Sequence, residues 1–108
     1  MKIRVRFYHW YPKLIGVGAI TLYPYILVST ERFQTPDCLL RHELEHVYQV
    51  RKLGWFKFYF LYLKDYIVGL FKYRNHNLAY LNISFEIEAR KSESQALNDE
   101  QRFDLNLT

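Results

Sequence analysis

The first part of the chain alternates polar and apolar residues. Residues 2–8, KIRVRFY, place charged and apolar side chains in turn, which predicts a half-buried strand. Residues 15–28 are rich in β-branched and aromatic side chains, so we expect one long strand or two short ones. Pro24 within this stretch favours the border of a sheet. We therefore expect residues 18–22 to form an edge strand, with an interior strand as the alternative.

A helix with clear ends is predicted at residues 36–53. Thr35 can accept hydrogen bonds from free backbone amides as the N-cap, and Pro36 suits the first helical position. Asp37 is favoured at the positive end of the helix dipole. Gly54 follows as a residue that can adopt the left-handed conformation. These signals make this helix the firmest structural prediction from the sequence.

Two further helices are expected in the second half. The aromatic segment beginning at residue 55 is apolar all round a helical projection, so we predict a buried helix at about 55–68. The alternative is a helix on a membrane surface whose lysines reach lipid head groups. Ser84 is expected to cap the next helix, at about 85–96.

Together these elements predict an α+β fold. The chain has 108 residues, enough for one domain, 1–108, but not for two. We expect a small antiparallel or mixed sheet in residues 1–34, a helical part in 35–97 and a polar tail in 98–108. No long apolar run is free of charge or proline, and no convincing signal peptide is present, so we expect a cytoplasmic protein.

Cysteine content and charge add little to this picture. Cys38 is the single cysteine and cannot form an internal disulfide; we expect a small, buried residue there. The net charge is +4, and residues 1–30 carry basic residues but no acid. A basic segment can meet nucleic acid or anionic lipid. Because no nucleic-acid motif accompanies it, we expect ordinary surface charge and no nucleic-acid partner.

The motif HELEH, residues 42–46, lies in the middle of the predicted helix. His42 and His46 are four positions apart, so both project from one face on successive turns. Two imidazoles so placed can bind one zinc ion. Glu43 lies about 100° round the helix, too far to be a ligand but close enough to exchange a proton with a zinc-activated water. The alternative is a solvated polar face, which stands only if the motif lacks helical context and a third ligand.

Several residues could supply that third ligand. A metzincin would carry another histidine shortly after the motif, but Gln49 and Lys52 occupy the matching positions. Glu86 and Glu88 form a carboxylate pair in the opening turns of a predicted helix. The full set of candidates is Glu86, Glu88, Asp65, His76 and the region of His9.

HELEHVYQ, followed by an aromatic helix and AYLNISFEIEAR, resembles the gluzincin branch of the zincin metallopeptidases, in particular the small single-domain minigluzincins. The resemblance covers about Gly18 to Lys91. In gluzincins with an E-x-x-A-D signature the first glutamate binds zinc, and that register implies Glu86, with Glu88 in reserve. The sequence departs from the signature at Arg90, where many relatives carry an aspartate that braces a zinc-binding histidine.

The resemblance implies a zincin-like fold and a zinc-dependent metallopeptidase with one Zn²⁺ per chain, held by His42, His46 and Glu86. Glu43 would be general base and acid, and Tyr80 the donor to the developing oxyanion. The substrate would be a peptide or unstructured protein that pairs with the edge strand. The alternative is a non-catalytic, zinc-stabilised binding module that uses its basic aromatic surface for a protein or membrane partner. The sequence leaves the oligomeric state open.

Overall fold

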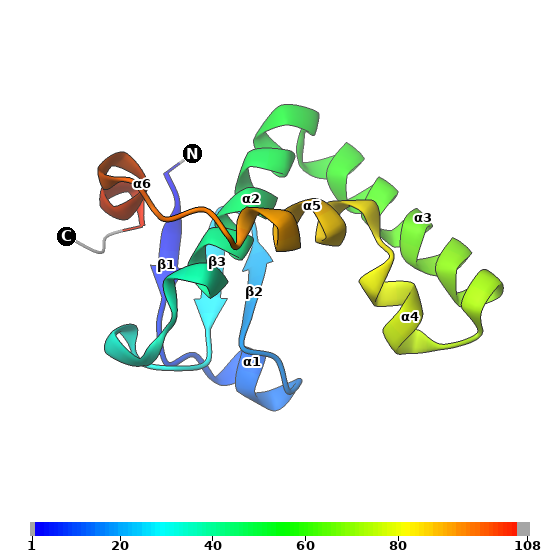
Figure 1. The fold of residues 1–108 in the computed structure, drawn as a ribbon, viewed down its shortest axis with the longest axis horizontal. Coiled ribbons are helices and arrows are strands. Elements are labelled where there is room, and N and C mark those ends of the chain that lie inside the picture. Colours follow the sequence, from blue (N-terminus) through cyan, green and yellow to red (C-terminus); the bar gives the residue numbers. More distant parts are fainter. Residues whose placement is uncertain (1, 106–108) are drawn as a thin grey trace.

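The computed structural model of the protein describes residues 2–105. Its N-terminal part is a mixed three-stranded sheet of β1 (Arg4–Arg6), β2 (Ala19–Leu22) and β3 (Tyr25–Val28). β3 lies in the centre, parallel to β1 and antiparallel to β2 (Figure 1). The stretch at residues 15–28 therefore forms two short strands, and β2 is an edge strand as predicted. The predicted α+β class, a small sheet followed by several helices, is confirmed.

A short helix, α1 (Trp10–Leu14), lies between the first two strands. His9 caps it, because its Nδ1 atom accepts a hydrogen bond from the backbone amide of Tyr11 at 3.1 Å. A single 3-10 turn, η1 (Arg32–Gln34), precedes the next helix.

The helix that carries the HELEH motif, α2 (Asp37–Leu53), is confirmed, but its start differs from the prediction. Pro36 is the N-cap residue and makes no side-chain cap. Thr35 does not cap the helix, because its hydroxyl donates to the carbonyl oxygen of Glu31 at 2.7 Å. Gly54 ends the helix with φ +88°, although its ψ of 152° is outside the left-handed helical region. The helix therefore ends where the sequence predicts, but the backbone conformation of Gly54 differs from the expected one.

One face of α2 packs on the sheet. Leu40, Leu44 and Val47 are fully buried and belong to one cluster with Ile26 and Val28 of β3. Position 38 lies about 200° round the helix from position 40, on the side away from this core. Cys38 is exposed accordingly, and the expectation of a buried cysteine was wrong.

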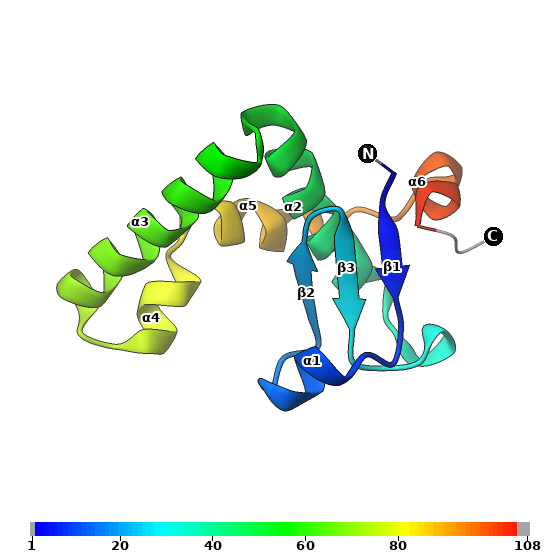
Figure 2. The ribbon, with the colours of Figure 1, turned by 180° about the vertical axis from the view of Figure 1, so that it is seen from behind.

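The C-terminal segment closes the far side of this core. α6 (Asp99–Asp104) lies beside β1, at the opposite end of the molecule from α3 and α4 (Figures 1 and 2). Leu97 and Leu105, on either side of α6, are buried in the core cluster. Part of the predicted polar tail therefore packs into the hydrophobic core. Residues 106–108 of that tail lie outside the described part of the chain.

α3 (Trp55–Tyr73) is longer than predicted and is not buried. Of its described residues only Phe58 and Gly69 are buried, while Phe56 and Phe71 are 78% and 80% exposed. The helix extends beyond the sheet, and α4 (His76–Leu81) folds back along it (Figure 1). Neighbours therefore cover it on one side only. Among residues 2–105, no helix has the length and apolar character needed to cross a membrane.

α5 (Ser84–Ser92) packs beside α2 and ends earlier than the predicted residue 96. Its N-cap residue is Ile83, so Ser84 does not cap it. The Ser84 hydroxyl instead donates to Asp65 Oδ2 at 2.7 Å, which ties the start of α5 to α3. This packing brings Glu86, in the first turn of α5, to the HELEH face of α2.

Candidate metal centre

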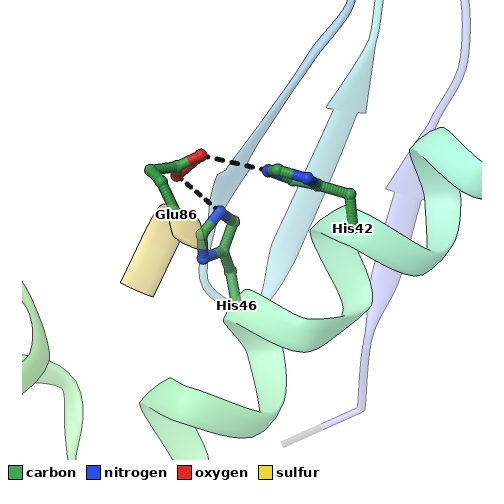
Figure 3. Close-up of side chains that lie close together, drawn as sticks. All are labelled: His42, His46 and Glu86. Atoms are coloured by element: carbon green, nitrogen blue, oxygen red, sulfur yellow. Dashed lines mark hydrogen bonds and ion pairs between the residues drawn. The ribbon is translucent and has the colours of Figure 1, made fainter. Parts of the chain in front are cut away.

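The two histidines of α2 meet one carboxylate of α5. His42 Nε2 lies 3.0 Å from Glu86 Oε1, and His46 Nε2 lies 2.7 Å from Glu86 Oε2 (Figure 3). One ligand atom from each of the three side chains falls within 4.8 Å of the others. Their side chains are only 12%, 7% and 3% exposed. His42, His46 and Glu86 thus form a buried group that could hold a metal ion.

The outer ring nitrogens of both histidines have their own partners. His42 Nδ1 lies 2.8 Å from Glu93 Oε1, and His46 Nδ1 lies 2.9 Å from Gln49 Oε1. A carboxylate oxygen and an amide oxygen can only accept here, so each Nδ1 atom carries the proton. In a neutral imidazole this leaves the Nε2 lone pair free. The two Nε2 atoms that face Glu86 are therefore the ones available to a metal.

Gln49 is itself held in place. Its Nε2 atom donates to the Phe85 carbonyl oxygen and to Glu88 Oε2, each at 3.1 Å. Those two donations fix Gln49 Oε1 toward His46. Glu88, the reserve ligand, acts on the site through Gln49 and is not part of the triad. Arg90, which replaces the expected aspartate, donates to the carbonyl oxygen of Leu81.

Burial and the neighbouring charges shift the pKa values of the three side chains in opposite directions. Burial disfavours charged histidine, but the hydrogen bond to Glu86 and the charges of Glu86 and Glu43 outweigh it. The pKa of both His42 and His46 is raised as a result. Burial likewise disfavours ionised Glu86, yet the hydrogen bonds from the two histidines hold its pKa well below the usual range. Without metal, protonated histidines and a carboxylate stabilise one another.

Two tyrosines complete the surroundings of Glu86. Tyr62 donates to Glu86 Oε2 at 3.1 Å, and Tyr80 donates to Glu86 Oε1 at 2.9 Å. Burial and the nearby Glu86 charge raise the pKa of both phenols. Both hydroxyls therefore keep their protons at neutral pH and remain donors.

Glu43 lies beside the triad and is 5% exposed. Thr21 of β2 holds it from the other side, because the Thr21 hydroxyl lies 3.1 Å from the Glu43 carbonyl oxygen and 3.4 Å from its Oε2 atom. Burial raises the pKa of the Glu43 carboxyl group, against the opposing charges of His46 and His42. A raised pKa makes a carboxylate a stronger base for proton transfer than an exposed glutamate is.

A cavity of about 200 Å³ opens next to these groups. Glu43, His46 and Glu86 lie in its wall together with residues 19–22 of the edge strand β2. Val17, ahead of β2, also lines it, and the rest of the wall is aromatic and comes from α3 and α4: Phe58, Tyr59, Tyr62 and Tyr80. The cavity is therefore mostly apolar, and His46, Glu86 and Glu43 form its polar part.

The other candidate ligands have different partners. His76 Nδ1 lies 2.6 Å from the Tyr66 hydroxyl, Asp65 accepts from Ser84, and His9 caps α1. None of them belongs to the group of three.

Sequence reasoning missed Thr21, Tyr62, Glu93 and the role of Gln49. The first three come from β2, α3 and the residue after α5, so no local spacing connects them with the motif. The contact of Gln49 with His46 could have been predicted, because Gln49 lies three residues after His46 on the same face of α2.

Two imidazole nitrogens and a carboxylate oxygen are a donor set that catalytic zinc sites use, with a further position left open. The residues present therefore fit zinc: both Nε2 atoms converge, both Nδ1 atoms are braced, and a cavity adjoins. Neither a family model, nor a curated protein, nor a solved structure matches this chain. The resemblance to gluzincins consequently rests on the motif residues themselves.

Proposed function

We propose that this protein is a zinc-dependent metallopeptidase, with zinc held by His42, His46 and Glu86. The observation that carries the proposal is the convergence of both Nε2 atoms on one buried carboxylate, with Glu43 buried alongside. A structural zinc site usually has four protein ligands. Three ligands next to a cavity favour a site that accepts a substrate.

Glu43 is the proposed general base and acid. When bound, a zinc ion supplies Lewis acidity, which polarises a peptide carbonyl group and makes water more acidic. Glu43 takes a proton from the attacking water and passes it to the amine that leaves as the C–N bond breaks. Thr21 orients its carboxylate. Tyr80, which lines the cavity, is the proposed donor to the oxyanion. Its hydroxyl donates to Glu86 Oε1 in this structure and would have to turn from Glu86 to the substrate.

The edge strand supplies the proposed contact with an extended peptide. Tyr59 already uses part of this edge: its hydroxyl accepts from the Tyr23 amide at 3.2 Å and lies 3.4 Å from the Thr21 carbonyl oxygen. The part of the β2 edge that Tyr59 does not contact is the part proposed to pair with a substrate. A peptide paired there would run along the cavity wall, past Glu43.

Zinc-loaded protein incubated with an unstructured protein such as casein tests the proposal. Wild type should cleave it, and Glu43→Gln should lose about 10²- to 10⁴-fold in rate while keeping its zinc. Glu45→Gln is the matched control, because Glu45 lies on the same helix but pairs with Arg41 at 2.8 Å. Equal cleavage by wild type and Glu43→Gln would exclude Glu43 as the base.

The second candidate is a zinc-stabilised binding module without catalysis. The exposed aromatic side of α3 favours it, since Phe56 and Phe71 are almost fully exposed. Stable zinc binding together with no cleavage of any unstructured protein, at any zinc loading, would support this alternative.

A further inference from the structure

One side of α3 is an apolar stripe that the described chain leaves uncovered. Its members are spaced by four, three, four and four residues, which places them in one line along the helix. Their exposed fractions range from 43% to 80%. This α3 stripe consists of Phe56, Phe60, Leu63, Ile67 and Phe71. Contiguous apolar surface of this kind marks an interaction site.

The opposite side of α3 faces the rest of the molecule. Phe58 lies about 200° round the helix from Phe56 and lines the cavity. A Cβ atom on Gly69 would lie 3.0 Å from Ala79 Cα, so α4 packs tightly against that side. The stripe thus points away from both the metal centre and α4, and its occupation would leave the cavity open.

The exposed charges beside the stripe are positive. Lys57 and Lys64 are exposed on α3, about 100° and 80° round the helix from Phe56. Asp65, the helix's acidic residue, lies about 180° from Phe56 and accepts hydrogen bonds from the Ser84 amide and hydroxyl. Its carboxylate is therefore directed at α5, and the α3 stripe is apolar with a basic border.

We propose that the α3 stripe docks the protein on an anionic lipid surface, with α3 lying in the plane of the interface. A helix with aromatic and aliphatic residues on one side and lysines beside them is the type that binds at this boundary. From Phe56 to Phe71 the stripe extends about 22 Å along the helix axis. Lysine stems at its border can pack on apolar surface while their ammonium groups reach phosphates.

Charge and shape favour lipid over other occupants. A second copy of the chain would add two more lysines at the contact, with no exposed acid on α3 to pair with them. A protein partner would need a groove for a single convex helix and acids placed beside it. An anionic bilayer supplies negative charge along the whole length and deforms around the aromatic rings.

Vesicle binding tests the proposal on the full chain. The chain has two tryptophans, so in Trp10→Phe the remaining Trp55, at the start of α3, reports on this surface. With phosphatidylcholine vesicles containing about a third phosphatidylserine, its emission should shift to the blue and the protein should co-float. With phosphatidylcholine alone, binding should fall at least tenfold. Equal binding to both vesicles, or to neither, would overturn the proposal.

Two variants and a control locate the contact. The triple variant Phe60→Gln, Leu63→Gln, Ile67→Gln should lose vesicle binding while keeping its helical circular dichroism. Phe103→Gln should bind like wild type, because Phe103 is a 68% exposed phenylalanine on α6, at the other end of the molecule. Loss of binding in both, or in neither, would contradict a contact through the α3 stripe.

Charge reversal and sedimentation decide between lipid and protein. Lys57→Glu with Lys64→Glu should weaken binding to the anionic vesicles by about fivefold or more per charge. If wild type instead forms a dimer in sedimentation that the triple variant abolishes, and ignores vesicles, the stripe is a protein interface and the proposal fails.

Discussion

Glu93 Oε1 lies 2.8 Å from His42 Nδ1, although Glu93 follows the end of α5 and is 51 residues further along the chain. This contact fixes the tautomer of His42, because the carboxylate accepts the Nδ1 proton. Nε2 is then directed at Glu86. Gln49 does the same for His46 through an amide oxygen.

Glu93→Ala should weaken zinc binding by about 10- to 100-fold, because an unbraced imidazole can rotate and change tautomer. A competition titration against a chromophoric zinc chelator measures this. Glu100→Ala, an exposed acid on α6, is the control and should keep wild-type affinity. Equal loss in both variants would point to general electrostatics in place of bracing.

Thr21→Val should slow cleavage while leaving zinc content unchanged. The substitution keeps the β-branched shape of the side chain and removes the hydroxyl that holds Glu43. We expect a fall in kcat of about tenfold, from a less well oriented base, with KM little changed. Full activity with wild-type zinc content would show that Thr21 does not position Glu43.

Stabilisation by zinc should grow with pH. In the metal-free protein the raised pKa of His42 and His46 means that their contribution is present below the unfolded value of 6.5 and is lost as pH rises through the raised folded value. Zinc needs the deprotonated imidazoles, so protons compete with it most strongly at low pH. Thermal unfolding with and without excess zinc should show a larger gain at about pH 8 than at about pH 6. A gain that does not change with pH would argue against histidine ligands.

Much of this centre is predictable from the sequence, because its parts follow local rules. Once end signals at Pro36 and Gly54 predict a helix, the four-residue spacing places His42 and His46 on the same face of it. The carboxylate pair Glu86 and Glu88 was indicated by its position in the opening turns of a later helix, and the resemblance to gluzincins selected Glu86 from that pair. The edge position of β2 was predicted from a single proline.

What the sequence did not yield depends on long-range packing. The composition of α3 indicates burial, but whether a partner covers its outer side is a property of the whole fold. In the same way Thr21, Tyr62 and Glu93 reach the site from separate elements. Thr35 was expected to cap α2, but its hydroxyl donates to the carbonyl oxygen of Glu31 instead.

Gly69→Ala should destabilise the protein by about 1–3 kcal/mol, although alanine favours helices, because the new methyl group would press on the Ala79 backbone. Val68→Ala, at an exposed neighbouring position, is the control and should cost much less. Urea unfolding measures both. A stabilised Gly69→Ala would mean that α3 and α4 are not packed this closely. Since α4 carries Tyr80, the destabilised variant should also cleave more slowly.

The central claim is that His42, His46 and Glu86 bind zinc together. Native mass spectrometry of zinc-reconstituted protein tests it most directly, by reporting the metal per chain. Wild type and Glu88→Gln should each carry one zinc ion, and Glu86→Ala should carry none while remaining folded. No zinc on wild type, or retention by Glu86→Ala with loss in Glu88→Gln, would contradict zinc binding by these three residues.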